Sequence, residues 1–337
     1  MRYPNVKQSH IVPRGYLRSF AVDEQIAMRL VDASSSRLIS LNDAGTRRRF
    51  YRRTRPDGTP IDDVEWSLAH IDDKAAPLLR EIENRWPLDT DDKATLAEFF
   101  GFQLVRGPGW REWHTTQLGD SLERLRSEGV PALDIAPGTT DADRFVRHLE
   151  SDLSEDTETM RRMLSLGPKG ACVLGSMHWA LIRFNRPVIA TSDHPVVVWP
   201  RGFKTLRPTP MGLGLGLLET LEVRVPLSPR LVLLMTWLWD GDSPSVLTAR
   251  KHHAGNINAF TVANADRQWF HFPDTTPPVR DGSFTPISLE LLAGYGADEA
   301  THSPRREKTR ALVMPTVGRD LATEFRMLTV SPATAAP

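Results

Sequence analysis

The chain has 337 residues, which fits one large domain or two closely packed ones. Lys+Arg and Asp+Glu each number 42, so the net charge is zero and any attraction of nucleic acid requires a local basic patch. Cys172 is the single cysteine, which excludes an internal disulfide and a cysteine zinc site.

The sequence contains no signal that predicts insertion into a membrane. Residues 1–12 lack the apolar core of a signal peptide. The longest apolar stretch, residues 231–238, has the length of a buried strand and is far shorter than the roughly 20 residues that span a bilayer. We therefore expect a cytoplasmic protein that makes no membrane contact.

In the first half of the chain, turn residues and apolar spacing predict mainly helices. A short helix is expected over residues 16–21, and a hairpin over residues 27–41 around a polar turn. Apolar residues at helical spacing predict four longer helices, over residues 62–82, 90–105, 110–125 and 141–166. Gly107-Pro108-Gly109 should interrupt the chain between the second and the third of these.

After Gly167 the pattern changes to short β-branched and aromatic runs, which predict a mostly antiparallel sheet. Strands are expected over residues 179–184, 188–191, 196–199, 221–225, 231–237 and 269–272, and a helix over residues 247–265. The sequence therefore predicts a single α+β domain over residues 1–330, with a helical first half packed on a mostly antiparallel sheet in the second half. Its helix-rich part is 62–166 and its sheet-rich part 167–273, and residues 331–337 are expected to form a flexible tail.

Common catalytic fingerprints do not occur: the sequence has no P-loop, no H-E-x-x-H and no G-x-S-x-G. His252 and His253 are adjacent, so on a helix their side chains would point about 100° apart. We expect them on a solvated face rather than around a metal ion.

Four polar residues fall on the apolar faces of two predicted helices. Glu65 and Asp72 lie two turns apart on the face that carries Leu68, and Gln103 and Arg106 lie on the apolar stripe of the next helix. Desolvating such groups without a partner costs several kcal/mol, so they should be paired with each other or held for a ligand. One interpretation is a buried ion pair, of Glu65 or Asp72 with Arg106, that clamps the helices. The other is a charged pocket between them.

Two further candidates precede turns. His10 and Arg14 flank the turn at Pro13, where they either dock the start of the chain onto a fixed site or serve as a turn cap and a surface charge. Ser192 and Asp193 end a predicted strand, where they either bond to nearby amides or face a cleft.

A run of arginines is the strongest basic patch in the sequence. It surrounds Phe50 and Tyr51 and contains Arg47, Arg48, Arg49, Arg52, Arg53 and Arg55. Arginines with interleaved aromatic residues can bind phosphates and stack on bases, which predicts nucleic acid as a partner. The alternative is a solvated loop whose charges are answered by acidic neighbours.

Six segments in this order resemble the bacterial domain-of-unknown-function family 4238. They are HIVPRGYLRSF (10–20), VEWSLAHID (64–72), FFGFQLVR (99–106), ATSDHPV (190–196), VPLSP (225–229) and residues 256–270. The resemblance implies no reaction, because that family has no settled activity. It implies motif positions at His10, Pro13, Arg14, Glu65, Asp72, Gln103, Arg106, Ser192, Asp193 and Pro195. The sequence departs from the resembled pattern at two positions. Asp72 stands where that pattern has Glu, and Gly107 stands where a small hydroxyl residue is more usual.

These residues favour a hydrolase as the leading hypothesis. His10, Glu65, Asp72 and Asp193 would supply acid–base chemistry or bind a divalent metal. The substrate would be a phosphodiester or nucleic acid bound by Arg14, Gln103, Arg106 and Ser192, with Arg47, Arg48, Arg49, Arg52 and Arg53 as a guide surface. The alternative is a non-catalytic binding protein whose buried polar network only stabilises the fold.

Overall fold

A computed structural model describes residues 7–54, 57–128, 155–200, 215–238, 246–280, 285–293 and 303–317. The helices are α1 (Arg14–Leu17), the 3-10 turn η1 (Arg18–Phe20), α2 (Asp63–Glu81), α3 (Thr90–Val105), α4 (Pro108–Glu128), α6 (Glu155–Ser176), α7 (Leu215–Leu218), α8 (Lys251–Ala263), α9 (Ser288–Leu292) and α10 (Pro304–Val317). The strands are β1 (Gln8–His10), β2 (Gln25–Leu30), β3 (Arg37–Ser40), β4 (Thr46–Arg48), β5 (Arg53–Thr54), β6 (Pro60–Ile61), β7 (His178–Arg183), β8 (Thr191–Ser192), β9 (Val197–Pro200), β10 (Thr220–Ser228), β11 (Leu231–Thr236), β12 (Val246–Thr248) and β13 (Gln268–His271). The fold is α+β.

The largest sheet has the strand order β12-β7-β11-β10-β9 and is antiparallel except where β12 pairs with β7. Successive side chains of β11 point to opposite faces, and every one of them is buried. Leu233 belongs to the core that contains Phe100 of α3, whereas Leu234 packs in a second core with Ile257 of α8. The sheet is therefore covered on both faces by apolar helices.

A second sheet joins the two halves of the chain, and it corrects the predicted separation into a helical half and a sheet half. Its order is β3-β2-β13-β8, so β2 of the predicted hairpin pairs with β13, which follows it by more than 200 residues, and β13 in turn pairs with β8. Strands thus occur in both halves, as the β1–β4 and β5–β6 pairs also show. Sequence alternation predicts a strand but not its distant partner, which is why this pairing was missed.

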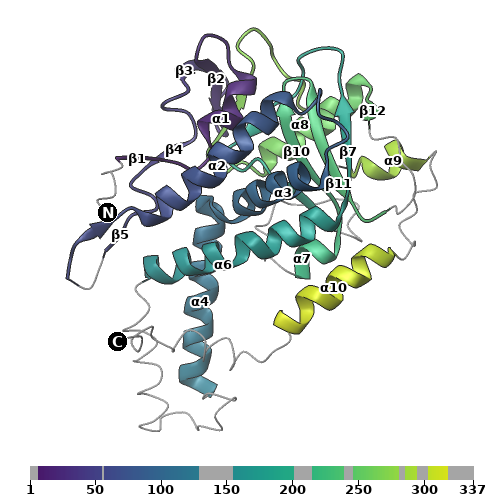
Figure 1. Ribbon diagram of the computed structural model, residues 1–337. Helices are drawn as coiled ribbons and strands as arrows, with labels where there is room; N and C mark the ends of the chain where they lie inside the picture. The colour runs from purple at the N-terminus through teal and green to yellow at the C-terminus, as the bar shows by residue number, and fades with distance from the viewer. Residues whose placement is uncertain are drawn as a thin grey trace.

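The helical layer is held together by close packing of α3 on α6, which run side by side in Figure 1. The expected end of the helix at residue 166 is wrong, because α6 continues through Gly167 and Pro168 to Ser176. A Cβ at Gly101 of α3 would lie only 2.4 Å from the carbonyl oxygen of Gly167. Glycines at this crossing therefore serve the approach of two helices and do not mark a helix end.

The remaining sequence predictions concern short segments and ends of elements. The predicted interruption at residues 107–109 is a short break before α4, which begins at Pro108 because proline fits the first position of a helix. The predicted strand over 188–191 is reduced to Thr191–Ser192 of β8. The expected start of the helix at residue 141 and the tail 331–337 lie outside the described residues.

Candidate functional site

Arg106, the residue that caps α3, forms the centre of a buried polar cluster. It is 2% exposed, and its Nη1 and Nη2 donate to the two carboxylate oxygens of Asp72 at 2.7 and 3.1 Å. Nη2 also donates to the carbonyl oxygen of His10 at 2.7 Å, and the Tyr51 hydroxyl donates to the carbonyl oxygen of Arg106 at 2.9 Å. Arg106 therefore links α2, α3 and β1. Its pairing with Asp72 corresponds to the ion-pair interpretation of the sequence.

His10 and Glu65 both lie beside this ion pair. Among the described residues, the buried Nε2 of His10 and the buried Oε2 of Glu65 have no hydrogen-bond partner. Burial lowers the pKa of His10, and a hydrogen bond with the backbone of Leu41 partly offsets this. The charge of Arg106 lowers this pKa further, and the charge of Asp72 raises it. Burial raises the pKa of Glu65, against the lowering effect of a hydrogen bond with Ser9. The pKa values of the two groups are thus shifted toward each other.

Gln103 lies one turn before Arg106 on α3 and is 2% exposed. In the described part of the chain, neither its amide nitrogen nor its amide oxygen has a hydrogen-bond partner. A buried amide without partners costs stability, which sets Gln103 apart from the paired Arg106 one turn later.

Arg14 begins α1 and lies close enough to the His10 imidazole for its charge to lower the His10 pKa, as the smallest of several causes after burial. Its Nη2 donates to Glu24 at 2.5 Å, and both side chains are largely exposed. Arg14 therefore supplies positive charge near His10 from the solvent side.

Asp193 and Ser192 serve the turn before β13. The Asp193 carboxylate accepts hydrogen bonds from the backbone amides of Asp266, Arg267 and Gln268 at 2.8 to 3.1 Å. Burial raises the pKa of Asp193 to about 6, although these amides lower it. The Ser192 hydroxyl donates to the carbonyl oxygen of His194 at 3.0 Å. Both side chains thus have the turn-forming role that the sequence left open as one alternative.

The family model described as "Protein of unknown function (DUF4238)" matches residues 8–275, which include the whole polar cluster. The chain belongs to the DUF4238 family. No curated protein and no solved structure matches it. The resemblance of the six sequence segments is thereby confirmed.

The arginine run of this DUF4238 protein is divided between paired and exposed side chains. Arg52 donates to both oxygens of Asp62 at 2.9 Å, Arg47 contacts Asp266 at 2.7 Å, and Arg53 pairs with Asp63. Arg48 and Arg49 are exposed, and Arg49 has a left-handed backbone with φ of 51°. Arg55 lies outside the described residues. Only Arg48 and Arg49 of the described run therefore present exposed positive charge.

His194 follows Ser192 and Asp193 in the same turn, and the sequence presents it at a strand end together with Asp193. Burial lowers its pKa, against a hydrogen bond with the backbone of Leu104 at the end of α3. Its Cδ2 lies 3.9 Å from where a Cβ would stand on Gly107. The sheet turn thus reaches the end of α3 through His194 rather than through Asp193.

The expectation for His252 and His253 is wrong in its geometry. Both imidazoles approach the same oxygen of Glu290, with Nε2 to Oε1 distances of 3.1 and 3.0 Å, and among the described residues these three form a group that could surround a metal ion. However, Nδ1 of His253 accepts a hydrogen bond from the backbone N–H of Arg250 at 3.0 Å. A neutral imidazole that accepts at Nδ1 carries its proton on Nε2, so this helix cap opposes metal binding there.

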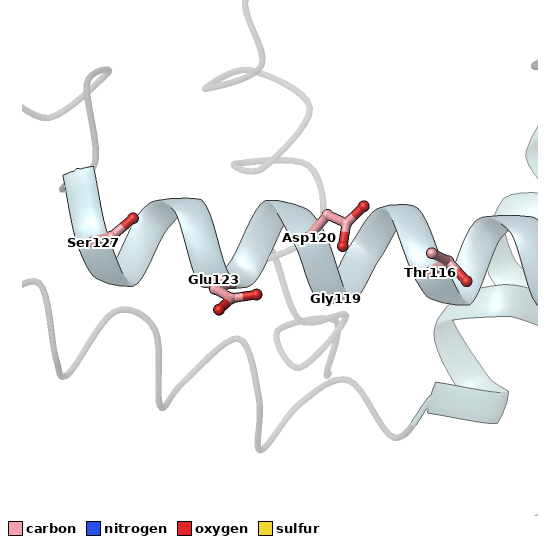
Figure 2. A pocket seen from close by; sticks show the side chains of 5 residues that line it. All are labelled: Thr116, Gly119, Asp120, Glu123 and Ser127. Atoms are coloured by element: carbon pink, nitrogen blue, oxygen red, sulfur yellow. The ribbon is translucent and has the colours of Figure 1, made fainter.

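A hollow of about 770 Å³ along α4 is lined by exposed residues of this single helix, among them Asp120 and Glu123 (Figure 2). Side chains from a single exposed helix face cannot enclose a small molecule, so we assign no function to it. Among the helices that the structure describes, none has the length and apolar character needed to cross a bilayer.

Proposed function

We propose that this DUF4238 protein is a hydrolase of phosphodiesters in which His10 and Glu65 form the acid–base pair. The observation that carries the proposal is that two titratable side chains flank one buried ion pair and each has a buried atom with no partner among the described residues. Shifted pKa values cluster at catalytic sites, where burial and neighbouring charges produce them.

The β1–β4 ribbon supports an anionic substrate. Its register places His10 opposite Thr46 and Gln8 opposite Arg48, so His10 and the exposed Arg48 lie on the same face of the ribbon. Arg14 adds positive charge on the solvent side of His10. Arg48, Arg49 and Arg14 would therefore guide a nucleic acid or another phosphodiester.

In the proposed reaction, one group of the pair removes a proton from water, and the water oxygen attacks phosphorus. The other group gives a proton to the oxygen of the leaving alcohol as its bond to phosphorus breaks. If the same side chains instead held a divalent cation, that cation would polarise the phosphoryl oxygen. Because the two atoms are buried, substrate access requires movement of the side chains that cover them.

The variants His10→Asn and Glu65→Gln test the proposal. Each is expected to lower kcat/KM for bis(p-nitrophenyl) phosphate or a short RNA by a factor on the order of 10² to 10⁴. Glu123→Gln on the exposed face of α4 is the matched control and should change nothing. Assays run with Mg²⁺ and with a chelator identify a metal requirement. If all four proteins are folded and hydrolyse equally, the pair is not catalytic.

The pH dependence of kcat/KM should also follow from the two shifted groups. The reaction needs one group protonated and the other deprotonated, so activity is lost below the lower pKa and above the higher one. The raised pKa of Glu65 lies above 4.5 and the lowered pKa of His10 lies below 6.5. We expect a bell-shaped profile, and each of His10→Asn and Glu65→Gln should remove one of its two limbs. A maximum above pH 8 would exclude this pair.

The closed Arg106–Asp72 pair and the paired arginines favour a second candidate, a non-catalytic protein whose polar cluster only stabilises the fold. In that case His10→Asn and Glu65→Gln would change the free energy of unfolding but no reaction. The hydrolysis assay on purified protein separates the two candidates.

A further inference from the structure

A second hollow, of about 540 Å³, lies away from the His10 cluster at the end of the four-stranded sheet. The turn between β2 and β3 supplies Ser34, Ser35 and Ser36 to its wall. The facing wall comes from β13 and the residues that follow it, with Trp269, His271, Pro273, Thr275, Thr276, Pro277 and Val279. Its volume is within the range of small-molecule sites, and hydroxyl groups line it beside apolar rings.

Ser36 and His271 meet in this pocket. The Ser36 Oγ lies 2.8 Å from Nε2 of His271, and Nδ1 of the same ring lies 2.9 Å from the carbonyl oxygen of Phe272. A carbonyl oxygen only accepts, so Nδ1 carries a proton and Nε2 of the neutral ring has the lone pair. The Ser36 hydroxyl is therefore the donor to Nε2.

The ring is held in its neutral form. His271 is 5% exposed, and burial lowers its pKa, against a hydrogen bond with the backbone of Phe272, while the charge of Arg29 lowers it further. Ser36, by contrast, is exposed to solvent. An exposed hydroxyl that donates to a buried, neutral and oriented imidazole is the arrangement of an activated serine nucleophile.

Arg29 gives the pocket a positive wall. It faces Trp269 across the β2–β13 pair, with the guanidinium carbon 5.5 Å from the ring centroid, and its Nε donates to the carbonyl oxygen of Ala33 at 2.7 Å. These contacts fix the guanidinium at the rim without a carboxylate partner among the described residues. A fixed guanidinium can bind a carboxylate of a ligand or stabilise a developing oxyanion.

We propose that Ser36 and His271 form a nucleophile–base pair that cleaves small carboxylic esters bearing an anionic group. In the first step Ser36 Oγ bonds to the ester carbonyl carbon while its proton passes to Nε2 of His271. The adduct then expels the alkoxide, which takes that proton and leaves as the alcohol. Water attacks the acyl-serine, its proton passes to His271 and then to Ser36 Oγ, and the carboxylic acid is released. Arg29 binds the anionic group, and Trp269 packs on the apolar part.

Nothing in the sequence pattern marks this pair. Ser34-Ser35-Ser36 reads as an ordinary polar turn, and His271 is separated from it by more than 230 residues. The pairing of β2 with β13, in which His271 faces Ala27, brings the two together. The same hydrogen bond would arise if Ser36 merely satisfied a buried imidazole, so the test must report on reactivity.

The test uses a fluorophosphonate probe on the full-length protein, followed by peptide mass spectrometry. We expect the probe on Ser36, so Ser36→Ala should abolish the labelling, and His271→Gln should lower the labelling rate by a factor on the order of 10². Ser40→Ala, in β3 and outside the pocket wall, is the matched control and should label as the wild type does. Hydrolysis of p-nitrophenyl succinate should exceed that of p-nitrophenyl acetate, and Arg29→Gln should remove this preference.

Absence of labelling in the folded wild type would overturn the proposal, and so would equal labelling of Ser34, Ser35 and Ser36. His271→Gln alters a buried side chain, so the thermal unfolding of that variant is recorded. If His271→Gln is unfolded, the test rests on Ser36→Ala, whose side chain is exposed. The result is independent of the proposed phosphodiesterase, since His10→Asn and Glu65→Gln should leave Ser36 labelling unchanged.

Discussion

Replacing Arg106 by Met is expected to lower the free energy of unfolding by about 3–5 kcal/mol, because it leaves the partner charge of a buried ion pair uncompensated. The loss includes the hydrogen bond that Arg106 donates to the carbonyl oxygen of His10, so β1 should detach from α2 and α3. The measurement is equilibrium unfolding in urea at neutral pH, followed by tryptophan fluorescence.

Two further variants decide whether the ion pair is the cause. Replacing Asp72 by Leu in the Arg106→Met protein removes the uncompensated carboxylate and should recover most of the lost stability. Arg48→Met, on the exposed face of β4, should change the free energy of unfolding by no more than about 0.5 kcal/mol. If Arg106→Met is as stable as Arg48→Met, the pair is not a clamp.

Replacing Gly101 by Ala should destabilise the protein by about 1–3 kcal/mol or more, because overpacking forces backbone shifts. The new Cβ would lie 2.4 Å from the carbonyl oxygen of Gly167 and 2.6 Å from the backbone nitrogen of Ala171. These are backbone atoms of α6 and cannot rotate away, so α3 and α6 must separate. Thermal unfolding monitored by circular dichroism measures the effect.

Gly170→Ala is the matched control for this helix pair. Its Cβ would meet its nearest neighbour, the Cα of Gly101, at 3.5 Å, which is ordinary contact. Alanine is favoured over glycine in a helix by roughly 1 kcal/mol, so this variant should be as stable as the wild type or more stable. Equal destabilisation by both alanines would show that the two helices do not pack as described.

Local elements could be predicted from the sequence, whereas their long-range partners could not. Acidic residues at Asp62 and Asp63 and the apolar spacing after them predict α2, and the polar turn at 32–36 predicts the β2–β3 hairpin. The pairing of β2 with β13 depends on side-chain packing between segments far apart in the chain. The glycines of α6 predict a break because local propensity cannot reveal that another helix approaches them.

The site shows the same limit. Inward-facing polar residues on α2 and α3 predict that Asp72 and Arg106 meet companions, and the structure shows that they bind each other and β1. The sequence could not show which arginines form ion pairs and which face solvent. Asp266, the partner of Arg47, follows Arg47 by more than 200 residues. Nor could it show that the Asp193 carboxylate accepts hydrogen bonds from backbone amides, or that His194 forms a hydrogen bond with the backbone of Leu104 in α3.

The most direct test of the His10–Glu65 proposal is a double-mutant cycle of phosphodiester hydrolysis with His10→Asn, Glu65→Gln and the combined variant. Residues that act as one unit show non-additive losses, so we predict that the combined variant is no slower than the slower of the two single variants. Undiminished hydrolysis by the folded combined variant would contradict the account.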